Sequence, residues 1–411
     1  MVDKRAFVRL QPEEQQEANA RLVTALDGIR VLDMARLGPG PHCAQILADL
    51  GADVIKIEAP PVTEGKRAGR EINLPPDAAI RRDSRSASLN LKSDDGREAF
   101  YRLTKTADVV MEGFRPGVVK RLGVDYDTLR ELRPDIIYAS LTGYGQSGPY
   151  SGYVGHDLNY LGLTGIVDFT GAADGPPMIP GNTIADNAGG GMNAVISILA
   201  AVVAKQRTGA GQYIDCAMVD GLLTMMFLNV DDCVTSGEVK HRGETITTGR
   251  YPWYNIYETR DGKYLTVCAI EPWFFDNLCR LLGREDFIPH QRDEGEKRLA
   301  MFAAFRESFL TKTRDEWVAE LMPAETCVAP VYAMDEVVRD PHLRHREMIV
   351  EPELPGSASR PQVGVMVKLS ETPGRIRTGG AAPGESTDEI LAAIGYDVAA
   401  IEAMRAAGAV G

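Results

Sequence analysis

One stretch near the start of the chain decides the fold: Gly28-Ile-Arg-Val-Leu-Asp-Met-Ala-Arg-Leu-Gly-Pro-Gly-Pro-His-Cys-Ala-Gln-Ile-Leu-Ala-Asp-Leu-Gly-Ala-Asp-Val-Ile-Lys-Ile-Glu58. Residues 29–35 are strand-like, and residues 41–50 have helical spacing after a Gly-Pro-Gly-Pro turn. Proline suits the first turn of a helix because its missing N–H would be unpaired there anyway. Gly51 ends this helix, and residues 53–58 predict a second strand. A strand–helix–strand unit of this kind indicates a parallel sheet.

The same alternation continues through the first third of the chain. A strand pattern at 88–92 precedes a helix that opens at Ser93, and residues 108–112 form the next strand pattern. A helix over 126–132 then leads to a strand over 135–140. We therefore expect a large, Rossmann-like, doubly wound α/β domain, whose ligands bind at the carboxyl ends of the strands.

The pattern changes beyond about Asp231. Residues 250–270 predict a β-hairpin with its turn at 260–263, and helical segments follow at 273–282 and 299–321. We expect a smaller α+β domain there. The predicted organisation is a large domain at 1–230, the small domain at 231–340, and a C-terminal segment at 341–411 that returns to the large domain.

Composition excludes several classes of function. The formal net charge is −13, which disfavours nucleic acid and anionic membranes as partners. The six cysteines show no C-x-x-C pair and the histidines no H-E-x-x-H motif, so we expect free thiols and no metal site. Residues 1–16 lack the apolar core of a signal peptide, and the apolar run at 194–204 is too short to span a bilayer. A cytoplasmic enzyme is the expectation.

Common nucleotide and hydrolase motifs are absent. The turn at Gly38 to Gly40 lacks the G-x-G-x-x-G fingerprint, and there is neither a P-loop lysine motif nor a G-x-S-x-G elbow. Nicotinamide binding and Ser–His–Asp hydrolysis therefore have little support.

Two short segments carry residues suited to acid–base chemistry. In Gly155-His156-Asp157, a histidine and an aspartate lie between a turn and a helix; alternatively Asp157 caps the helix and His156 only packs at the turn. Asp186 precedes three glycines, Gly189 to Gly191, and is either a helix cap or a carboxylate beside a ligand that approaches the glycine backbone.

Basic or polar residues follow several predicted strands. Each segment alone is typical of a solvated surface, but together they suit a phosphorylated nucleotide tail. The residues concerned are Lys56 with Glu58, Leu91 with Lys92, Arg115, and Arg121.

Taken in order, these segments resemble the class III coenzyme A-transferase superfamily, and within it the α-methylacyl-CoA racemases. The resemblance runs from Leu26 to about Arg377. Its motifs are Gly-Ile-Arg-Val-Leu-Asp-Met-Ala at 28–35, Gly-Pro-Gly-Pro-His at 38–42, Ala-Asp-Leu-Gly-Ala-Asp-Val-Ile-Lys-Ile-Glu at 48–58, Glu-Gly-Phe-Arg-Pro-Gly at 112–117, Gly-Tyr-Gly-Gln-Ser-Gly-Pro-Tyr at 143–150 and Arg-Thr-Gly-Ala-Gly-Gln at 207–212.

Three features resemble the racemases more than the transferases. The motif Gly-His-Asp-x-Asn-Tyr is intact at 155–160, and the superfamily's catalytic aspartate matches Asp186 at the racemase spacing from His156. The racemase Ile-Glu-Pro segment that supports the histidine matches residues 270–272, which implies a role for Glu271. The glycine-run loop of formyl-CoA transferases is not evident.

The resemblance also implies an architecture and a ligand. Family members are interlocked homodimers, and their coenzyme A phosphates are held by arginines that match Arg115 and Arg121. A further phosphate-binding arginine of the family falls at Ala59, for which Lys56 is the candidate replacement. No cofactor is implied beyond the coenzyme A moiety of the substrate.

The implied reaction is epimerisation of a 2-methylacyl-CoA thioester, with His156 and Asp186 as the two bases on opposite faces of the α-carbon. Glu271 would orient His156, and Asp157 would position it. One alternative is coenzyme A transfer between carboxylic acids through a mixed anhydride on Asp186. The other is an acyl-CoA binder without catalysis. The acyl group is left open by the sequence.

Overall fold

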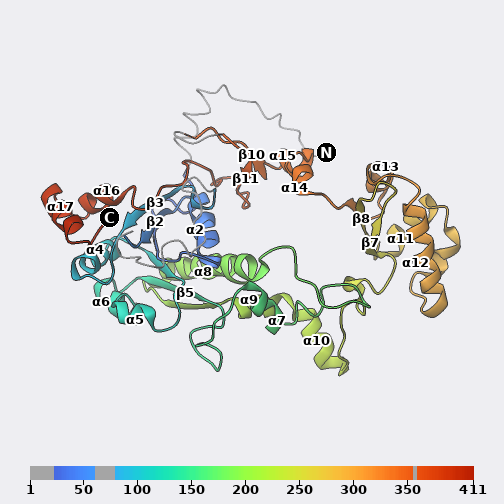
Figure 1. Ribbon diagram of the computed structural model, residues 1–411, viewed down its shortest axis with the longest axis horizontal. Helices are drawn as coiled ribbons and strands as arrows, with labels where there is room; N and C mark the ends of the chain where they lie inside the picture. Colours follow the sequence, from blue (N-terminus) through green and yellow to red (C-terminus); the bar gives the residue numbers. More distant parts are fainter. Residues whose placement is uncertain (1–22, 61–78, 355–358) are drawn as a thin grey trace. The chain divides into compact units, whose positions relative to one another are not determined.

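The computed structural model describes residues 23–60, 79–354 and 359–411, so the polar leader at 1–16 lies outside it (Figure 1). The chain forms two compact units, each built from separate stretches of sequence. The first unit takes in the described residues of Met1–Val154, Ala185–Gly221 and Arg344–Gly411, and the second takes in Gly155–Ile184 and Leu222–Leu343.

A six-stranded, fully parallel sheet forms the centre of the first unit, in the order β3-β2-β1-β4-β5-β6. This is the order of a doubly wound Rossmann-type sheet, in which the winding direction reverses between β1 and β4. The predicted fold class is therefore confirmed. The strands are β1 (Arg30–Asp33), β2 (Asp53–Glu58), β3 (Ser84–Ser88), β4 (Val109–Glu112), β5 (Ile137–Thr142) and β6 (Tyr213–Ala217).

Helices cover both faces of this sheet, which explains why successive residues of its central strands β1 and β4 are buried on both faces. Val31 faces a core shared with α2 (Pro39–Asp49) and α8 (Asn193–Thr208). Leu32, one residue later, faces a second core shared with α4 and the C-terminal helices. The remaining helices of this unit are α4 (Asp94–Thr104), α5 (Val118–Leu122), α6 (Tyr126–Leu132), α16 (Thr387–Ala393) and α17 (Val398–Ala406) (Figure 1).

The apolar helix of the first unit is longer than the predicted run of 194–204. A π-helical segment, η3 (Ala185–Met192), continues directly into α8, and Ala185–Thr208 is long and apolar enough to cross a bilayer by length and composition. Within the unit, however, Val195 and Ile198 of this helix pack in the core beside the sheet. The burial of this face is that of a core helix.

The second unit is a three-stranded antiparallel sheet, order β7-β8-β9, with helices packed around an aromatic core. The hairpin turn falls at the predicted place, where Gly262 has a φ of 71°. Trp253, Phe275 and Phe305 are fully buried in this core. The elements are α7 (Asp157–Leu163), α10 (Phe227–Ser236), β7 (Tyr254–Glu258), β8 (Tyr264–Cys268), α11 (Pro272–Leu281), α12 (Gly295–Phe309), α13 (Arg314–Leu321), β9 (Val328–Pro330) and α14 (Met334–Val337), with α9 (Met218–Met225) running across the boundary between the units.

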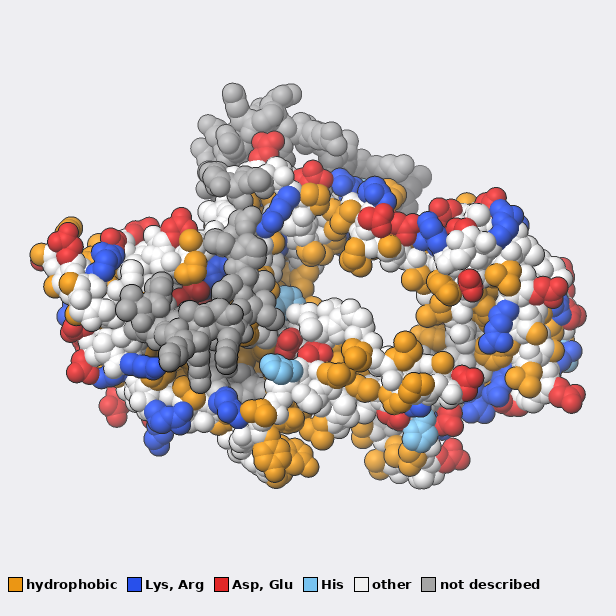
Figure 2. Space-filling model, viewed as in Figure 1, with side chains coloured by type: hydrophobic (Ala, Val, Ile, Leu, Met, Phe, Trp, Pro, Cys, Tyr) orange, Lys and Arg blue, Asp and Glu red, His pale blue; other side chains and the backbone are white. Residues whose placement is uncertain are grey.

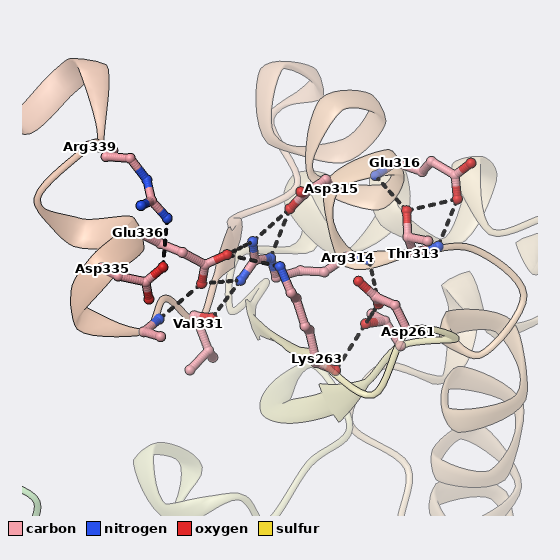
Figure 3. Close-up of polar contacts among 12 residues, drawn as sticks. Asp261, Lys263, Thr313, Arg314, Asp315, Glu316, Val331, Asp335, Glu336 and Arg339 are labelled. Carbon is pink, nitrogen blue, oxygen red and sulfur yellow. Dashed lines mark hydrogen bonds and ion pairs between the residues drawn. The ribbon is translucent and has the colours of Figure 1, made fainter.

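A buried arginine ties these elements together (Figure 3). The Arg314 side chain, 3% exposed, donates to both carboxylate oxygens of Glu336 at 2.9 and 2.7 Å and to the Val331 carbonyl at 3.0 Å. Lys263 of the hairpin binds the same carboxylate at 2.9 Å. The network therefore joins the hairpin, α13 and α14, and Arg314 lowers the pKa of Glu336 well below its usual range.

Candidate active site

The loops that follow the strands of the first unit all leave from one edge of the sheet, because parallel strands end on the same side. Asp33 ends β1, Glu112 ends β4, and the winding reverses between them. The loop after β4 carries Arg115, and the segment after β3 carries Lys92. The predicted coenzyme A residues that follow β3 and β4 thus leave the sheet from the same edge.

Asp186 lies beside the start of α2. The N-cap of that helix is Gly38, with a φ of 69°, and a Cβ built on it would lie 3.4 Å from Oδ1 of Asp186. Asp186 is the second residue of η3 and is half-buried. A carboxylate near a helix N-terminus is favoured in its ionised form. This placement is neither a simple N-cap nor a surface position.

Glycines make the close approach of η3 and α2 possible. A Cβ at Gly190 would lie 2.5 Å from the side chain of Pro39, and one at Gly191 would lie 2.9 Å from the ring of His42. Both distances are shorter than any real contact of a Cβ atom. The Gly189–Gly191 run therefore serves helix packing, which brings Asp186 to the α2 turn. His42 itself, with Nδ1 3.3 Å from the Asn187 carbonyl, is a neighbour that the sequence did not single out.

The loop after β4 places both predicted phosphate-binding arginines. Arg115 is exposed, and its carbonyl accepts the Val118 N–H at 3.1 Å where α5 begins. Arg121, near the end of α5, is also exposed, and a Cβ on Gly117 would lie 3.7 Å from its guanidinium. Two exposed cations thus flank one short loop, an arrangement suited to phosphate groups.

Glu112 holds the start of this loop by a hydrogen bond. It was not identified from the sequence as a functional residue. It is 1% exposed, and its Oε2 accepts the Phe114 N–H at 2.7 Å. Burial raises the pKa of Glu112 to about 7, against the opposing effect of hydrogen bonds from Ser140 and Phe114. The motif Glu-Gly-Phe-Arg was recognisable, but burial of its first residue depends on the covering strands.

Lys56 has a different environment from the one its predicted role requires. It is 5% exposed, and its ammonium group pairs with Asp33 at 2.7 Å across β1 and β2. Asp33 also accepts the Ala35 N–H at 2.8 Å. The ammonium group is thus engaged in holding the loop after β1. The arginine expected from the resemblance would fall farther along the chain, at Ala59.

The remaining predicted ligands differ in their exposure. Glu58 is bound by both terminal nitrogens of Arg81, at 3.1 and 2.7 Å, and by the Ser86 hydroxyl at 2.5 Å. Burial is the largest influence on its pKa, but these partners outweigh burial and the pKa is lowered. Leu91 packs against the second core, and Lys92 is exposed. Among Glu58, Leu91 and Lys92, only Lys92 has an exposed charged side chain.

The second unit carries His156 at the N-cap of α7. Its N–H donates to Asn159 Oδ1 at 3.0 Å, so an amide side chain caps this turn, and Asp157 is the first helical residue. The alternative in which Asp157 caps the helix does not hold, because the N-cap residue is His156. His156 is exposed, while the Tyr160 hydroxyl binds the Gly155 carbonyl at 2.6 Å and fixes the turn.

Glu271 is the N-cap residue of α11 and is half-buried. Its carbonyl accepts the Phe275 N–H at 3.1 Å. In the described part of the chain no hydrogen bond or ion pair joins Glu271 to His156. Asp186 belongs to the first unit, whereas His156 and Glu271 belong to the second.

Basic and acidic side chains are mixed on the surface. Figure 2 shows Lys and Arg side chains interspersed with Asp and Glu over the face in view. Within residues 23–60, 79–354 and 359–411, no group of three or more His, Cys, Asp or Glu side chains is placed to hold a metal ion.

Comparison with known proteins identifies relatives over nearly the whole chain. The model of the family "CoA-transferase family III" matches residues 26–387. Alpha-methylacyl-CoA racemase of Homo sapiens is 35% identical over 374 residues, covering 90% of this chain and 94% of the human protein. Succinyl-CoA:mesaconate CoA-transferase of Haloarcula marismortui is 34% identical over 393 residues, covering 91% and 97%.

A solved structure supports the same relationship as the sequence comparisons. The crystal structure of a CAIB/BAIF family protein from Brucella suis superposes with a TM-score of 0.77 at 29% identity, covering 90% of this chain and 100% of that one. Sequence and fold thus give the same group of relatives, which includes both racemases and transferases.

Proposed function

The chain belongs to CoA-transferase family III, and on that premise we propose that it epimerises the α-carbon of 2-methyl-branched acyl-CoA thioesters. The observation that carries the proposal is the state of His156. His156 is exposed at the start of α7, and its backbone N–H is held by Asn159 Oδ1 at 3.0 Å. An exposed histidine whose backbone is fixed at a helix start is suited to proton transfer.

The chemistry requires a base on each face of the α-carbon. The thioester carbonyl acidifies that carbon, and neutral His156 removes the proton from one face while protonated Asp186 donates a proton to the other. The reverse reaction starts from imidazolium and carboxylate, which hold the same number of protons between them. The two groups therefore titrate as a pair.

The enolate oxygen formed between these steps needs hydrogen-bond donors that are already in place. Gly38, the N-cap of α2, has no side chain between its backbone and the Asp186 carboxylate. Glu271 orients the imidazole of His156, and Asp157 positions the turn that carries it. Arg115, Arg121 and Lys92 hold the phosphates of coenzyme A.

We further propose that the protein is an interlocked cytoplasmic homodimer. A dimer would let residues of both units from two chains complete one site. Light scattering coupled to gel filtration tests this, and a mass of one chain, 44.7 kDa, would contradict it.

Coenzyme A transfer between carboxylic acids is the second candidate. Similarity to the succinyl-CoA:mesaconate CoA-transferase favours it. In that reaction the Asp186 carboxylate attacks the thioester carbonyl and expels coenzyme A as a thiolate, leaving a mixed anhydride. The thiolate attacks the Asp186 carbonyl and releases the donor acid, which leaves a thioester between Asp186 and coenzyme A. The acceptor carboxylate attacks this thioester and expels the thiolate, which then attacks the acyl carbon of the new anhydride to give the acceptor's acyl-CoA and free Asp186. His156 has no part in this sequence.

Proton NMR distinguishes the two reactions. A 2-methylacyl-CoA incubated with the protein in heavy water, without an acceptor acid, should lose its α-proton signal while one epimer converts toward an equal mixture. His156→Ala should abolish this exchange, whereas His290→Ala, at a surface histidine bound to Asp293, should leave it unchanged.

Other results of the same experiments would contradict epimerisation. Retention of the α-proton signal, transfer of coenzyme A once free acids are added, and an adduct trapped on Asp186 would make the protein a transferase. Saturable acyl-CoA binding with neither reaction would make it a binding protein.

A further inference from the structure

Two cysteines of the second unit lie opposite each other on neighbouring antiparallel strands. The register of β8 and β9 pairs Val267 with Val328, so the next residues outward are Cys268 and Cys327. The Cys268 N–H donates to the Cys327 carbonyl at 3.0 Å, which continues the pairing by one step. The two residues are 59 positions apart in sequence but adjacent in the sheet.

The side chain of Cys268 lies on the face of the sheet that is turned away from the core, and Cys327 is close enough for its charge to act on the Cys268 thiol. Val267 and Val328 are both buried in the aromatic core of the second unit. Because side chains alternate along a strand, Cys268 is on the opposite face. Cys268 is half-buried and Cys327 is exposed, in contrast to Cys43, Cys216 and Cys279, which are buried.

The separation expected for this pairing matches that of a disulfide. Hydrogen-bonded partners in an antiparallel pair have Cα atoms about 5.5 Å apart, and disulfides bridge Cα atoms about 4.4–6.8 Å apart. Cys327 also has a φ of 53°, in the left-handed region that non-glycine residues seldom adopt. Such backbone positions are over-represented at functional sites.

From this juxtaposition we propose that Cys268 and Cys327 form a reversible dithiol–disulfide site that is oxidised by peroxides. The exposed Cys327 thiolate attacks the O–O bond and becomes a sulfenic acid, releasing one water after protonation. The Cys268 sulfur then displaces the hydroxyl group as a second water, forming the S–S bond. Two thiols and one hydrogen peroxide thus give one disulfide and two waters.

The surroundings set the pH dependence of this reaction. Burial raises the pKa of both thiols; the charge of Cys327 raises that of Cys268 further, and Glu271 raises that of Cys327. Tyr254, on the other side of β8, has a raised pKa and faces Cys268. Since thiolates are the reactive species, oxidation should become faster as the pH rises above neutrality.

Removing the exposed thiol of Cys233 makes the test for a Cys268–Cys327 disulfide specific. In a Cys233→Ser chain, the thiols that are not buried are Cys268 and Cys327. This protein is treated with one equivalent of hydrogen peroxide, alkylated, digested and examined by mass spectrometry. We expect a peptide linked through Cys268 and Cys327 that is two hydrogens lighter than the sum of its parts and that separates on reduction.

Single variants separate the roles of the two sulfurs. Adding Cys268→Ser should leave a sulfenic acid at Cys327 that dimedone traps, and adding Cys327→Ser should suppress oxidation at least tenfold. Phenylarsine oxide, which bridges paired thiols, provides a measurement without either variant: one equivalent should protect both thiols from maleimide.

Three results would overturn the proposal. They are full alkylation of both thiols after peroxide, disulfides only between chains, or an arsenical that protects neither thiol. The acyl-CoA reaction is not measured in any of these experiments, so their outcome is independent of the proposed function.

Discussion

Replacing the buried carboxyl of Glu112 should change how the stability of the first unit depends on pH. Raising the pKa of this group from 4.5 to about 7 corresponds to about 3 kcal/mol, at about 1.4 kcal/mol for each tenfold change in proton affinity. The folded state keeps its proton between these pH values while the unfolded chain releases it. The contribution of Glu112 to stability is therefore fully present below pH 4.5, falls as the pH rises, and is constant again above about pH 7.

Glu112→Gln removes this titration and keeps an oxygen that accepts the Phe114 N–H. The free energy of unfolding of the variant minus that of the parent should therefore rise by about 3 kcal/mol between pH 4.5 and pH 8. All three tryptophans of the chain, Trp253, Trp273 and Trp317, belong to the second unit. The first unit is better followed by hydrogen exchange in peptides that contain β4 and β5.

The comparison of two pH values removes any constant cost of the substitution itself. Glu131→Gln, at an exposed position on α6, controls for loss of a surface carboxylate. If the difference between Glu112→Gln and the parent is the same at pH 4.5 and pH 8, the carboxyl is ionised alike in the folded and unfolded chains, and the reasoning about its burial is wrong.

Three further predictions concern packing and charge. Arg314→Met should destabilise the second unit by about 2 kcal/mol, because it removes the hydrogen bonds from Arg314 to the Glu336 carboxylate and the Val331 carbonyl, whereas Arg339→Ala, at a side chain 65% exposed, should change tryptophan-monitored unfolding by no more than about 0.5 kcal/mol. Gly190→Ala should cost about 1–3 kcal/mol in the first unit, since its Cβ would lie 2.5 Å from a proline side chain, and an equal cost for Gly152→Ala, where nothing lies within 4 Å, would refute this. Glu336, whose pKa Arg314 lowers, should stabilise the second unit above about pH 4.5 and lose this effect as the pH falls toward its folded pKa. Glu336→Gln should then unfold more readily than the parent at pH 7, and a gap as large at pH 2 as at pH 7 would contradict the assignment.

The sheet of the first unit could be predicted because its signals are local. Runs such as Val31 and Leu32 are apolar on both faces, and turn residues separate them from helices, so strand and helix alternate visibly. The start of α2 was predicted two residues late, at Pro41. Gly38 adopts a positive φ and caps the helix, and only the fold shows that Pro39 is already helical.

The candidate site was harder to predict because its contacts are not local. The ion pair of Lys56 with Asp33 joins two strands, and Glu112 is buried by strands and loops that are distant in sequence. A single sequence gives a charged residue after a strand but not its partner. The sequence showed that glycine is needed at 189–191. It did not show that these glycines pack against α2.

The second core of the first unit has a consequence for how the chain is made. Val410 pairs with Leu89, the Asn90 N–H binds the Ala409 carbonyl at 2.8 Å, and Ile401 is buried in the same core. The ribosome must therefore synthesise everything between β3 and α17, including the whole second unit, before this face of the sheet is covered. A nascent chain holds an open apolar surface for most of its synthesis, which makes it a client for chaperones that bind exposed strands.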